Sequence, residues 1–309
     1  MPKPAFVALA CAALLAGCGG SGAKSTPATT GTPKSSNSLL QGKTRLHLTR
    51  VGSLPESLAK AAAVALPHGR LMVIGGYAGG RSLDAILAGL PNRLRAIGHL
   101  PQPTHDAAAT VLGGFVYLFG GGNTISTPSV VRIDPRSGSA NEVPALGEPL
   151  SDLGAVAIGG QAYISGGFTD TEFASGIIRY LRPGGETLVA RLPQGTRYAG
   201  VTAIGRTIYV AGGLTPAGAT RSVYSVSLGG RVRRLATLPA PEDHAAMAAL
   251  GGTLYYVGGR KVLAIDPRSG RVSVAARLPA SLSDPTATTV GNRIVVTGGG
   301  TNGVWALTQ

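Results

Sequence analysis

The residues best suited to chemistry occupy one recurring position in this chain. Six runs of apolar, strand-forming residues end in two adjacent glycines, and an ionisable side chain stands 14 residues before the first glycine of five of these pairs. In the first copy, a one-residue insertion at 66–69 makes Lys60 the equivalent residue. Carboxylate and imidazole groups can act as general acids or bases, and all of these side chains can hydrogen-bond a polar ligand. The six candidate ligand-binding residues are Lys60, Asp106, Asp152, Tyr198, His244 and Asp284.

Further polar residues are expected on the same side of the fold. Because each glycine pair ends a second strand, the loop after it and the segment that enters each first strand share one face. Arg81 and Arg221, in two of these loops, add positive charge to the candidate ligand-binding face. The alternative is ordinary solvation, since Asp and Ser favour turns in any case. The other members of this face are Tyr77, His105, Asn123, Phe168, Asp170, Glu172, Glu242 and Asp243.

The glycine pairs recur with the period of a repeated structural unit. Their first glycines are separated by 45, 46, 46, 46 and 40 residues. A second phrase, Leu-Pro, follows the same steps of 46 and 40, with Leu146-Gly147 replacing it once. A fixed period in this range indicates one supersecondary unit whose copies bury their faces on one another. The pairs are Gly75-Gly76, Gly120-Gly121, Gly166-Gly167, Gly212-Gly213, Gly258-Gly259 and Gly298-Gly299.

The fifth copy illustrates the secondary structure of one repeat. Its residues predict strands over 245–250, 253–257, 261–265 and 271–276, with turns at 251–252 and 266–270. Four antiparallel strands in a repeat of this length form a propeller blade. The first strands are rich in small side chains, which fit where several sheets converge on an axis. The sequence therefore predicts an all-β, six-bladed β-propeller of four-stranded antiparallel blades.

The last copy lacks a fourth strand of its own, and the N-terminal part of the repeat region can supply it. We predict that 44–50 pairs antiparallel with 303–307, because the Leu-Pro register continues through this segment. The alternative is that 44–50 is still linker. The expected propeller spans 44–309, with blades at about 56–101, 102–147, 148–193, 194–239, 240–279, and 280–309 together with 44–55.

The repeats resemble those of the Kelch family. The phrase Leu-Pro-x-Pro…Ala-Ala-x-x-Leu-Gly-Gly-x-x-Tyr-x-x-Gly-Gly occurs at 100–121 and 238–259, and the resemblance covers about 44–309. It is degenerate: the third-strand Tyr survives only near Tyr180, and the fourth-strand Trp is missing, with Trp305 on a third strand instead. The Asp-Pro-Arg-Ser-Gly runs at 134–138 and 266–270 also look like quinoprotein and other bacterial propeller repeats, which lack the double glycine.

This resemblance implies a binding scaffold for a protein or glycan partner, which we expect to be monomeric. The alternative is a carbohydrate epimerase or mutarotase, as among Kelch-like sialate epimerases. Its acid or base would be Asp106, Asp152, Asp284 or His244, opposite Arg81 or Arg221. The short loops with no visible lid favour binding over catalysis. Galactose oxidase, a related propeller, needs a Tyr cross-linked to Cys, and the expected mature chain has no free thiol for it. We therefore assign no catalytic residue and expect neither a cofactor nor a metal.

The N-terminal residues predict export and lipid anchoring. Lys3, the apolar run 6–15 and the sequence Leu-Ala-Gly-Cys at 15–18 resemble the lipobox of bacterial lipoproteins. That resemblance implies a signal peptide at 1–17 and lipidation of Cys18. The alternative, a transmembrane anchor, conflicts with the short length of the run. Residues 18–43 contain the lipidated Cys and a tether without apolar periodicity. We expect the protein at the cell membrane, lipid-anchored on the extracytoplasmic face.

The chain is strongly basic, with a formal net charge of +14. The basic residues form no cluster and no aromatic platform accompanies them, so nucleic acid is not the expected partner. Arginines on the predicted fourth strands could attract anionic lipid headgroups or wall polymers. The favoured alternative is protection of sheet edges from pairing. These residues are Arg45, Arg50, Arg95, Arg191, Arg231, Arg233, Arg234, Arg271 and Arg277.

Overall fold

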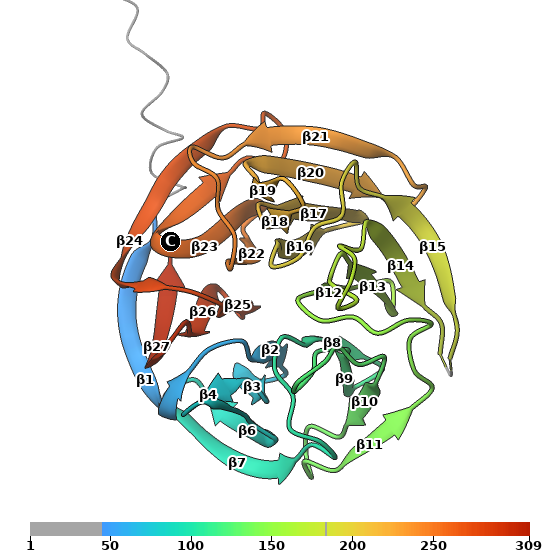
Figure 1. The fold of residues 1–309 in the computed structure, drawn as a ribbon. Coiled ribbons are helices and arrows are strands. Elements are labelled where there is room, and N and C mark those ends of the chain that lie inside the picture. Colours follow the sequence, from blue (N-terminus) through green and yellow to red (C-terminus); the bar gives the residue numbers. More distant parts are fainter. Residues whose placement is uncertain (1–44, 183) are drawn as a thin grey trace, which may run out of the picture. The chain divides into compact units, whose positions relative to one another are not determined.

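The computed structural model describes residues 45–309, except residue 183. These residues form an all-β, six-bladed propeller, which confirms the predicted fold class (Figure 1). Within the described residues, no helix has the length and apolar composition needed to cross a bilayer. The predicted signal peptide, Cys18 and the tether at 18–43 lie outside the described residues.

Each blade is an antiparallel sheet whose first strand lies innermost (Figure 1). The first blade contains β2 (Ala62–Leu66), β3 (Arg70–Ile74), β6 (Ala85–Leu90) and β7 (Arg93–His99). The second contains β8 (Ala108–Leu112), β9 (Phe115–Phe119), β10 (Val130–Ile133) and β11 (Ala140–Val143). The third contains β12 (Gly154–Ile158), β13 (Gln161–Ser165), β14 (Gly176–Tyr180) and β15 (Glu186–Arg191). The fourth contains β16 (Gly200–Ile204), β17 (Thr207–Ala211), β20 (Ser222–Ser227) and β21 (Val232–Thr237).

The fifth blade shows what a shortened loop does to a repeat. It contains β22 (Ala246–Leu250), β23 (Thr253–Ile265) and β24 (Val272–Leu282). The first half of β23 pairs with β22 and its second half with β24, so one continuous strand supplies both middle strands of the blade. In the first and fourth blades, the same connection carries a small hairpin, namely β4 (Tyr77–Ala78) with β5 (Arg81–Ser82) and β18 (Leu214–Thr215) with β19 (Gly218–Ala219).

The double glycines are required where two blades approach closely. Gly120 and Gly121 have φ values of 60° and 82°, and the Gly121 N–H donates to the carbonyl of Leu150 at 2.8 Å. A Cβ on Gly120 would overlap that same carbonyl, so only glycine fits. In five of the six blades the first glycine of the pair thus lies against a carbonyl of the chain that enters the next blade, whereas Gly258 of the fifth blade lies against Ala245 of its own blade.

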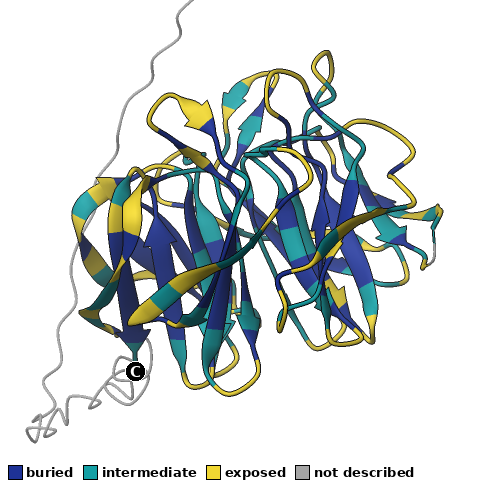
Figure 2. Cartoon of the chain, turned by 90° about the horizontal axis from the view of Figure 1, so that it is seen from below, coloured by how far each residue is buried: buried dark blue, intermediate teal, exposed yellow. Residues whose placement is uncertain are grey.

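The core lies between the faces of adjacent blades (Figure 2). At the interface of the second and third blades, Phe119 and Tyr180 are fully buried with ring centroids 5.3 Å apart, edge to face. The hydroxyl of Tyr180 donates to the carbonyl of Pro144 at 2.6 Å, which satisfies its one buried polar atom. Bulky second- and third-strand side chains thus fill the space between blades, while the small first-strand residues face the axis.

The ring closes by pairing both ends of the described chain in one sheet. The sixth blade contains β25 (Pro285–Val290), β26 (Arg293–Gly298), β27 (Thr301–Thr308) and β1 (His47–Leu58). β1 pairs antiparallel with β27, from His47 opposite Thr308 to Leu58 opposite Thr301. β1 is longer than the predicted 44–50 because Leu54 and Leu58 are also buried against the first blade. Thr44 lies outside the described residues.

Candidate functional site

The six candidate residues occupy one equivalent backbone position, immediately before the first strand of each blade. Their φ values all lie between 52° and 59°, in the left-handed region. A non-glycine residue in this region costs on the order of 1 kcal/mol and persists only where its surroundings enforce it. We call Lys60, Asp106, Asp152, Tyr198, His244 and Asp284 the mouth ring.

Backbone hydrogen bonds between neighbouring blades enforce this conformation. The N–H of Asp106 donates to the carbonyl of Lys60 at 2.9 Å, and Asp152 donates to Asp106 at 2.8 Å. The same bond joins Tyr198 to Asp152, Asp284 to His244, and Lys60 to Asp284 at 3.0, 2.9 and 3.2 Å. Among the described residues, these bonds hold five of the six junctions between blades at the point where a mouth-ring side chain leaves the backbone.

The mouth-ring side chains line one cavity. All six border a hollow of about 90 Å³ at the entrance to the channel. Four of them also border a wider hollow of about 210 Å³ beside it, together with Asn123, Phe168, Asp170 and Arg197. The structure therefore brings together the six residues that the sequence placed on one face.

Two cations pair with two carboxylates on one side of the mouth. Lys60 Nζ lies 2.9 Å from Asp106 Oδ2, and Arg197 Nε lies 3.2 Å from Asp152 Oδ2. Both carboxylates are nearly buried, with side-chain exposures of 9% and 4%. Burial lowers the pKa of Lys60, but the hydrogen bond and charge of Asp106 outweigh it, and the pKa lies above its ordinary value. Lys60 therefore stays charged.

Asp152 is the carboxylate whose titration the mouth changes most. Its burial, and after that the nearby charge of Asp106, raise its pKa to about 6, although Arg197 opposes the shift. A carboxyl group with such a pKa exchanges its proton near neutral pH. Burial also raises the pKa of Tyr198 to about 12, so its hydroxyl remains protonated and accepts a hydrogen bond from Arg197 Nη2 at 2.9 Å.

The opposite side of the mouth holds an imidazole and an aromatic surface. His244 Nδ1 lies 2.6 Å from Asp284 Oδ1, and this hydrogen bond raises the pKa of His244. The His244 ring stacks on Tyr198, with centroids 3.8 Å apart. Arg197 lies over the rings of Tyr198 and Phe168 at 4.5 and 4.4 Å. The cavity is thus lined by charged groups on one side and by stacked flat rings on the other.

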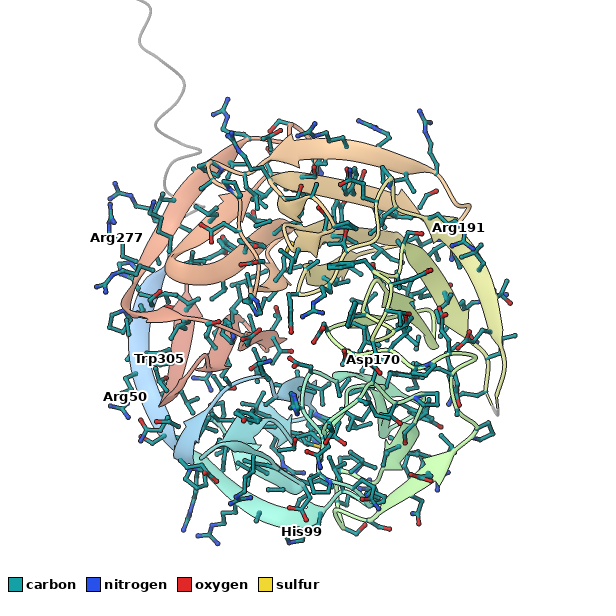
Figure 3. The ribbon with its side chains drawn as sticks, viewed as in Figure 1. Arg50, His99, Asp170, Arg191, Arg277 and Trp305 are labelled. Carbon is teal, nitrogen blue, oxygen red and sulfur yellow. The ribbon has the colours of Figure 1, made fainter. Side chains whose placement is uncertain are left out.

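A second cluster of hydrogen bonds fixes the loops that border the wider hollow. Ser82 Oγ lies 2.8 Å from His105 Nδ1 and donates to Asn123 Oδ1 at 2.8 Å. Ser126 donates through both its N–H and its hydroxyl to Asp170, and the hydroxyl distance is 2.7 Å. Burial lowers the pKa of His105, so this imidazole is neutral near pH 7. Asp170 lies near the axis of the propeller (Figure 3).

The structure places the two predicted arginines outside the mouth cavity. Arg81 is exposed on β5, and Arg221 donates from Nε to the carbonyl of Leu238 at 2.7 Å. Neither lines the cavity, and Arg197 supplies the guanidinium there instead. A signal for Arg197 was present in the sequence, because it directly precedes the mouth-ring residue of its own repeat, as His105 precedes Asp106.

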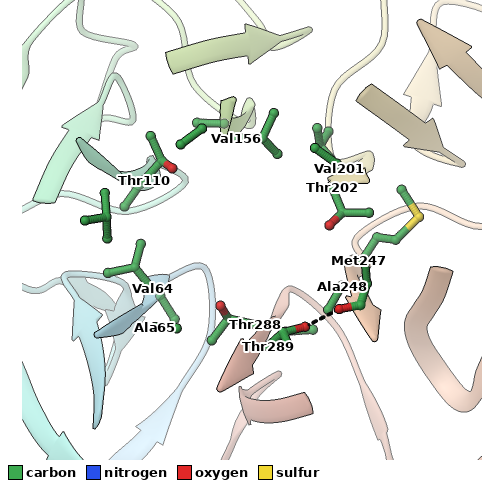
Figure 4. Close-up of a pocket in the computed structure, with 18 residues that line it drawn as sticks. Val64, Ala65, Thr110, Val156, Val201, Thr202, Met247, Ala248, Thr288 and Thr289 are labelled. Atoms are coloured by element: carbon green, nitrogen blue, oxygen red, sulfur yellow. Dashed lines mark hydrogen bonds between the residues drawn. The ribbon is translucent and has the colours of Figure 1, made fainter. Parts of the chain in front are cut away.

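A channel continues beyond the mouth ring along the axis. Figure 4 shows this cavity of about 350 Å³, lined by Ala, Val and Thr residues of the six first strands with Met247. Thr289 donates to the carbonyl of Ala249 at 2.6 Å. Over the residues that the structure describes, no group of three or more His, Cys, Asp or Glu side chains is placed to hold a metal ion.

Comparisons with known proteins establish the fold and go no further. No protein-family model matches the chain, and no curated protein matches it in sequence. A solved structure, titled "Structure of YjhT", matches with a TM-score of 0.71 and 15% sequence identity, over 83% of this chain and 95% of that one. At this identity the likeness supports the six-bladed propeller alone. The Kelch resemblance and the lipoprotein resemblance remain predictions.

Proposed function

We propose that this chain is an exported, lipid-anchored propeller that binds a glycan at the mouth ring. The observation that carries the proposal is the convergence of six polar side chains from six blades on one cavity. Concave sites with a few convergent polar groups are the usual binding sites of globular proteins. Export and anchoring through Cys18 are supported by the lipobox-like sequence at 15–18.

The composition of the mouth favours a glycan over a protein partner. A sugar presents hydroxyl groups that both donate and accept hydrogen bonds, and apolar ring faces that pack on aromatic side chains. The mouth offers carboxylate acceptors at Asp152 and Asp284, the donor Lys60, and the stacked rings of Tyr198 and His244. Its small, recessed cavity suits one or two sugar units better than the broad surface of a protein.

A glycan array followed by calorimetry tests the binding function. We expect Tyr198→Ala and Asp152→Asn to weaken the affinity for any array ligand by about 10-fold or more, since each removes one face or acceptor of the cavity. Arg81→Gln serves as the matched control and is expected to bind normally. The absence of any glycan ligand, or equal affinities for all four proteins, contradicts the proposal.

The anchoring part of the proposal has its own measurement. Mass spectrometry of the membrane fraction is expected to find Cys18 as a lipid-modified N-terminus. Cys18→Ser is expected to move the chain out of that fraction when the membranes are washed in high salt. A Cys18→Ser chain that stays bound under this wash overturns the lipid anchor without affecting the glycan site.

A second candidate function, sugar epimerisation or mutarotation, follows from Asp152. A carboxyl group with a pKa of about 6, held beside Arg197, can exchange a proton with a substrate near neutral pH. NMR observation of anomers or epimers of each bound sugar decides between the two functions. Turnover that Asp152→Asn abolishes even at sugar concentrations that saturate the weakened site would favour the enzyme over the binding protein.

A further inference from the structure

The propeller has a second face, opposite the mouth ring, built from short turns. In every blade the connection between the first and second strands lies on this side, and in the first five blades so does the connection between the third and fourth strands. We call this the turn face. In Figure 2 the C-terminus lies at the same edge as these tight turns. The turn face has no role in the proposed glycan site.

Arginines from all six blades occupy the turn face. Each follows or lies within one of these turns, and seven of the nine are exposed, whereas Arg70 and Arg293 are half-buried. Among the described residues, Arg93, Arg136 and Arg206 form no ion pair with a carboxylate, so their charge faces solvent uncompensated. The nine are Arg70, Arg93, Arg136, Arg182, Arg206, Arg231, Arg268, Arg271 and Arg293.

Acidic residues concentrate on the opposite side. Nine of the 14 Asp and Glu residues of the chain lie in loops on the mouth side: Asp84, Asp106, Glu148, Asp152, Asp170, Glu172, Glu242, Asp243 and Asp284. On the turn face, Asp134 and Asp266 use a carboxylate oxygen to accept backbone N–H groups of their own turns, from Arg136 and Arg268 at 2.8 Å each. The net positive charge is therefore carried mainly by the turn face.

Protection of sheet edges does not explain this charge. Edge protection places charged residues along outermost strands, and it accounts for Arg50, Arg191 and Arg277, which project outward from the perimeter (Figure 3). The turn-face arginines differ, because most of them lie in or beside hairpin turns, where no unpaired strand edge exists. Their gathering on one face requires another explanation.

The chain enters the propeller at this same face. His47 at the start of β1 pairs with Thr308, next to the C-terminal Gln309, and Leu46 N–H donates to the carbonyl of Ala275 at 3.0 Å. The described chain therefore begins at the turn face and not at the mouth.

We propose that the turn face docks on a bilayer surface of anionic lipid headgroups and so presents the mouth ring outward. The inference rests on the lipid anchor of the proposed function, which places the turn face near the membrane. Basic residues near an anionic bilayer gain attraction that adds from residue to residue and is screened by salt. The same contact leaves the glycan site open to the surroundings.

Vesicle binding of the unlipidated full-length chain, Cys18→Ser, separates docking from anchoring. We expect it to co-sediment with vesicles of phosphatidylcholine and phosphatidylglycerol at low salt, and not with phosphatidylcholine alone. Arg136→Glu, Arg206→Glu and Arg268→Glu together are expected to lower the partition coefficient by about 100-fold or more. The control is a second triple variant of the same total charge, whose substitutions lie on the mouth half or the perimeter: Arg191→Glu, Arg260→Glu and Arg277→Glu. We expect this control to lower the partition coefficient far less.

Equal losses of vesicle binding in the two triple variants would show that binding responds only to net charge, and would contradict docking through the turn face. Failure to bind anionic vesicles overturns it too, while the lipid anchor and the glycan site keep their separate tests. Stronger binding to a nucleic acid or to an anionic polysaccharide than to the vesicles would assign the face to that polymer and equally contradict the proposal.

A label measures the orientation directly. In the Cys11→Ser, Cys18→Ser chain, a fluorophore is attached through Asn292→Cys on the turn face or through Ala217→Cys on a mouth-side hairpin; both residues are exposed. We expect a nitroxide quencher on the lipid headgroups to quench the label at 292 and to leave the label at 217 bright. Equal quenching, or the reverse pattern, contradicts the proposed orientation.

Discussion

At the scale of single residues, the mouth ring combines backbone strain with buried charge. Six non-glycine residues adopt the same left-handed conformation, and five backbone hydrogen bonds between blades hold them there. Strained residues of this kind often mark functional sites, because only the surrounding structure can maintain them. Here the conformation also directs each side chain toward the cavity. The strain and the site therefore have one structural origin.

Asp152 gives a prediction on the dependence of stability on pH. Its pKa rises from 3.8 to about 6 on folding, so between these values the unfolded chain loses its proton while the folded one keeps it. The free energy of unfolding should therefore fall as pH rises through this window, by an amount on the order of 2–3 kcal/mol. Urea denaturation from pH 4 to pH 7 measures it. Asp152→Asn should lack this component, and identical curves for both proteins would contradict the assignment.

At the scale of the elements, the glycine pair joins the second strand of one blade to the entry of the next. Gly120 and Gly114 provide a matched comparison within one blade, because both have positive φ, at 60° and 85°. A Cβ on Gly120 would overlap the Leu150 carbonyl, whereas a Cβ on Gly114 would meet no atom within 4 Å. Their difference isolates the contact between blades from the backbone conformation.

We expect Gly114→Ala to cost about 1 kcal/mol of stability through its backbone conformation alone. Gly120→Ala should cost about 2–4 kcal/mol more, since the carbonyl it would strike must move. Chemical denaturation of both variants gives the comparison. Similar losses of stability for the two variants would contradict this, because they would show that the Leu150 carbonyl can move away from the added methyl group at no cost.

At the scale of the whole molecule, stability depends on closing the circle. β1 covers the edge of β27, and Leu54 and Leu58 of β1 are 3% exposed. Deletion of residues 45–58 should lower the melting temperature by more than about 10 °C, because it removes buried leucines and leaves an open strand edge. Calorimetry with size-exclusion chromatography measures both the loss and any association. Deletion of 25–36 is the control, and equal melting temperatures for the two deletions would contradict the closure.

The sequence alone encodes the number of blades, most of the strands within them and the six positions of the mouth ring, although the two strands predicted at 253–257 and 261–265 are one continuous strand, β23. These features repeat every 40 to 46 residues, and local turn chemistry and side-chain size encode them directly. The tertiary structure decided the rest, because contacts between blades have no fixed spacing along the chain. Only the folded ring shows that Arg197, and not Arg81 or Arg221, faces the cavity, and that Asp106 lies close enough to raise the pKa of Asp152. Residues that are 46 positions apart in the sequence become buried together, and their charges interact, only because the sheets converge on one axis.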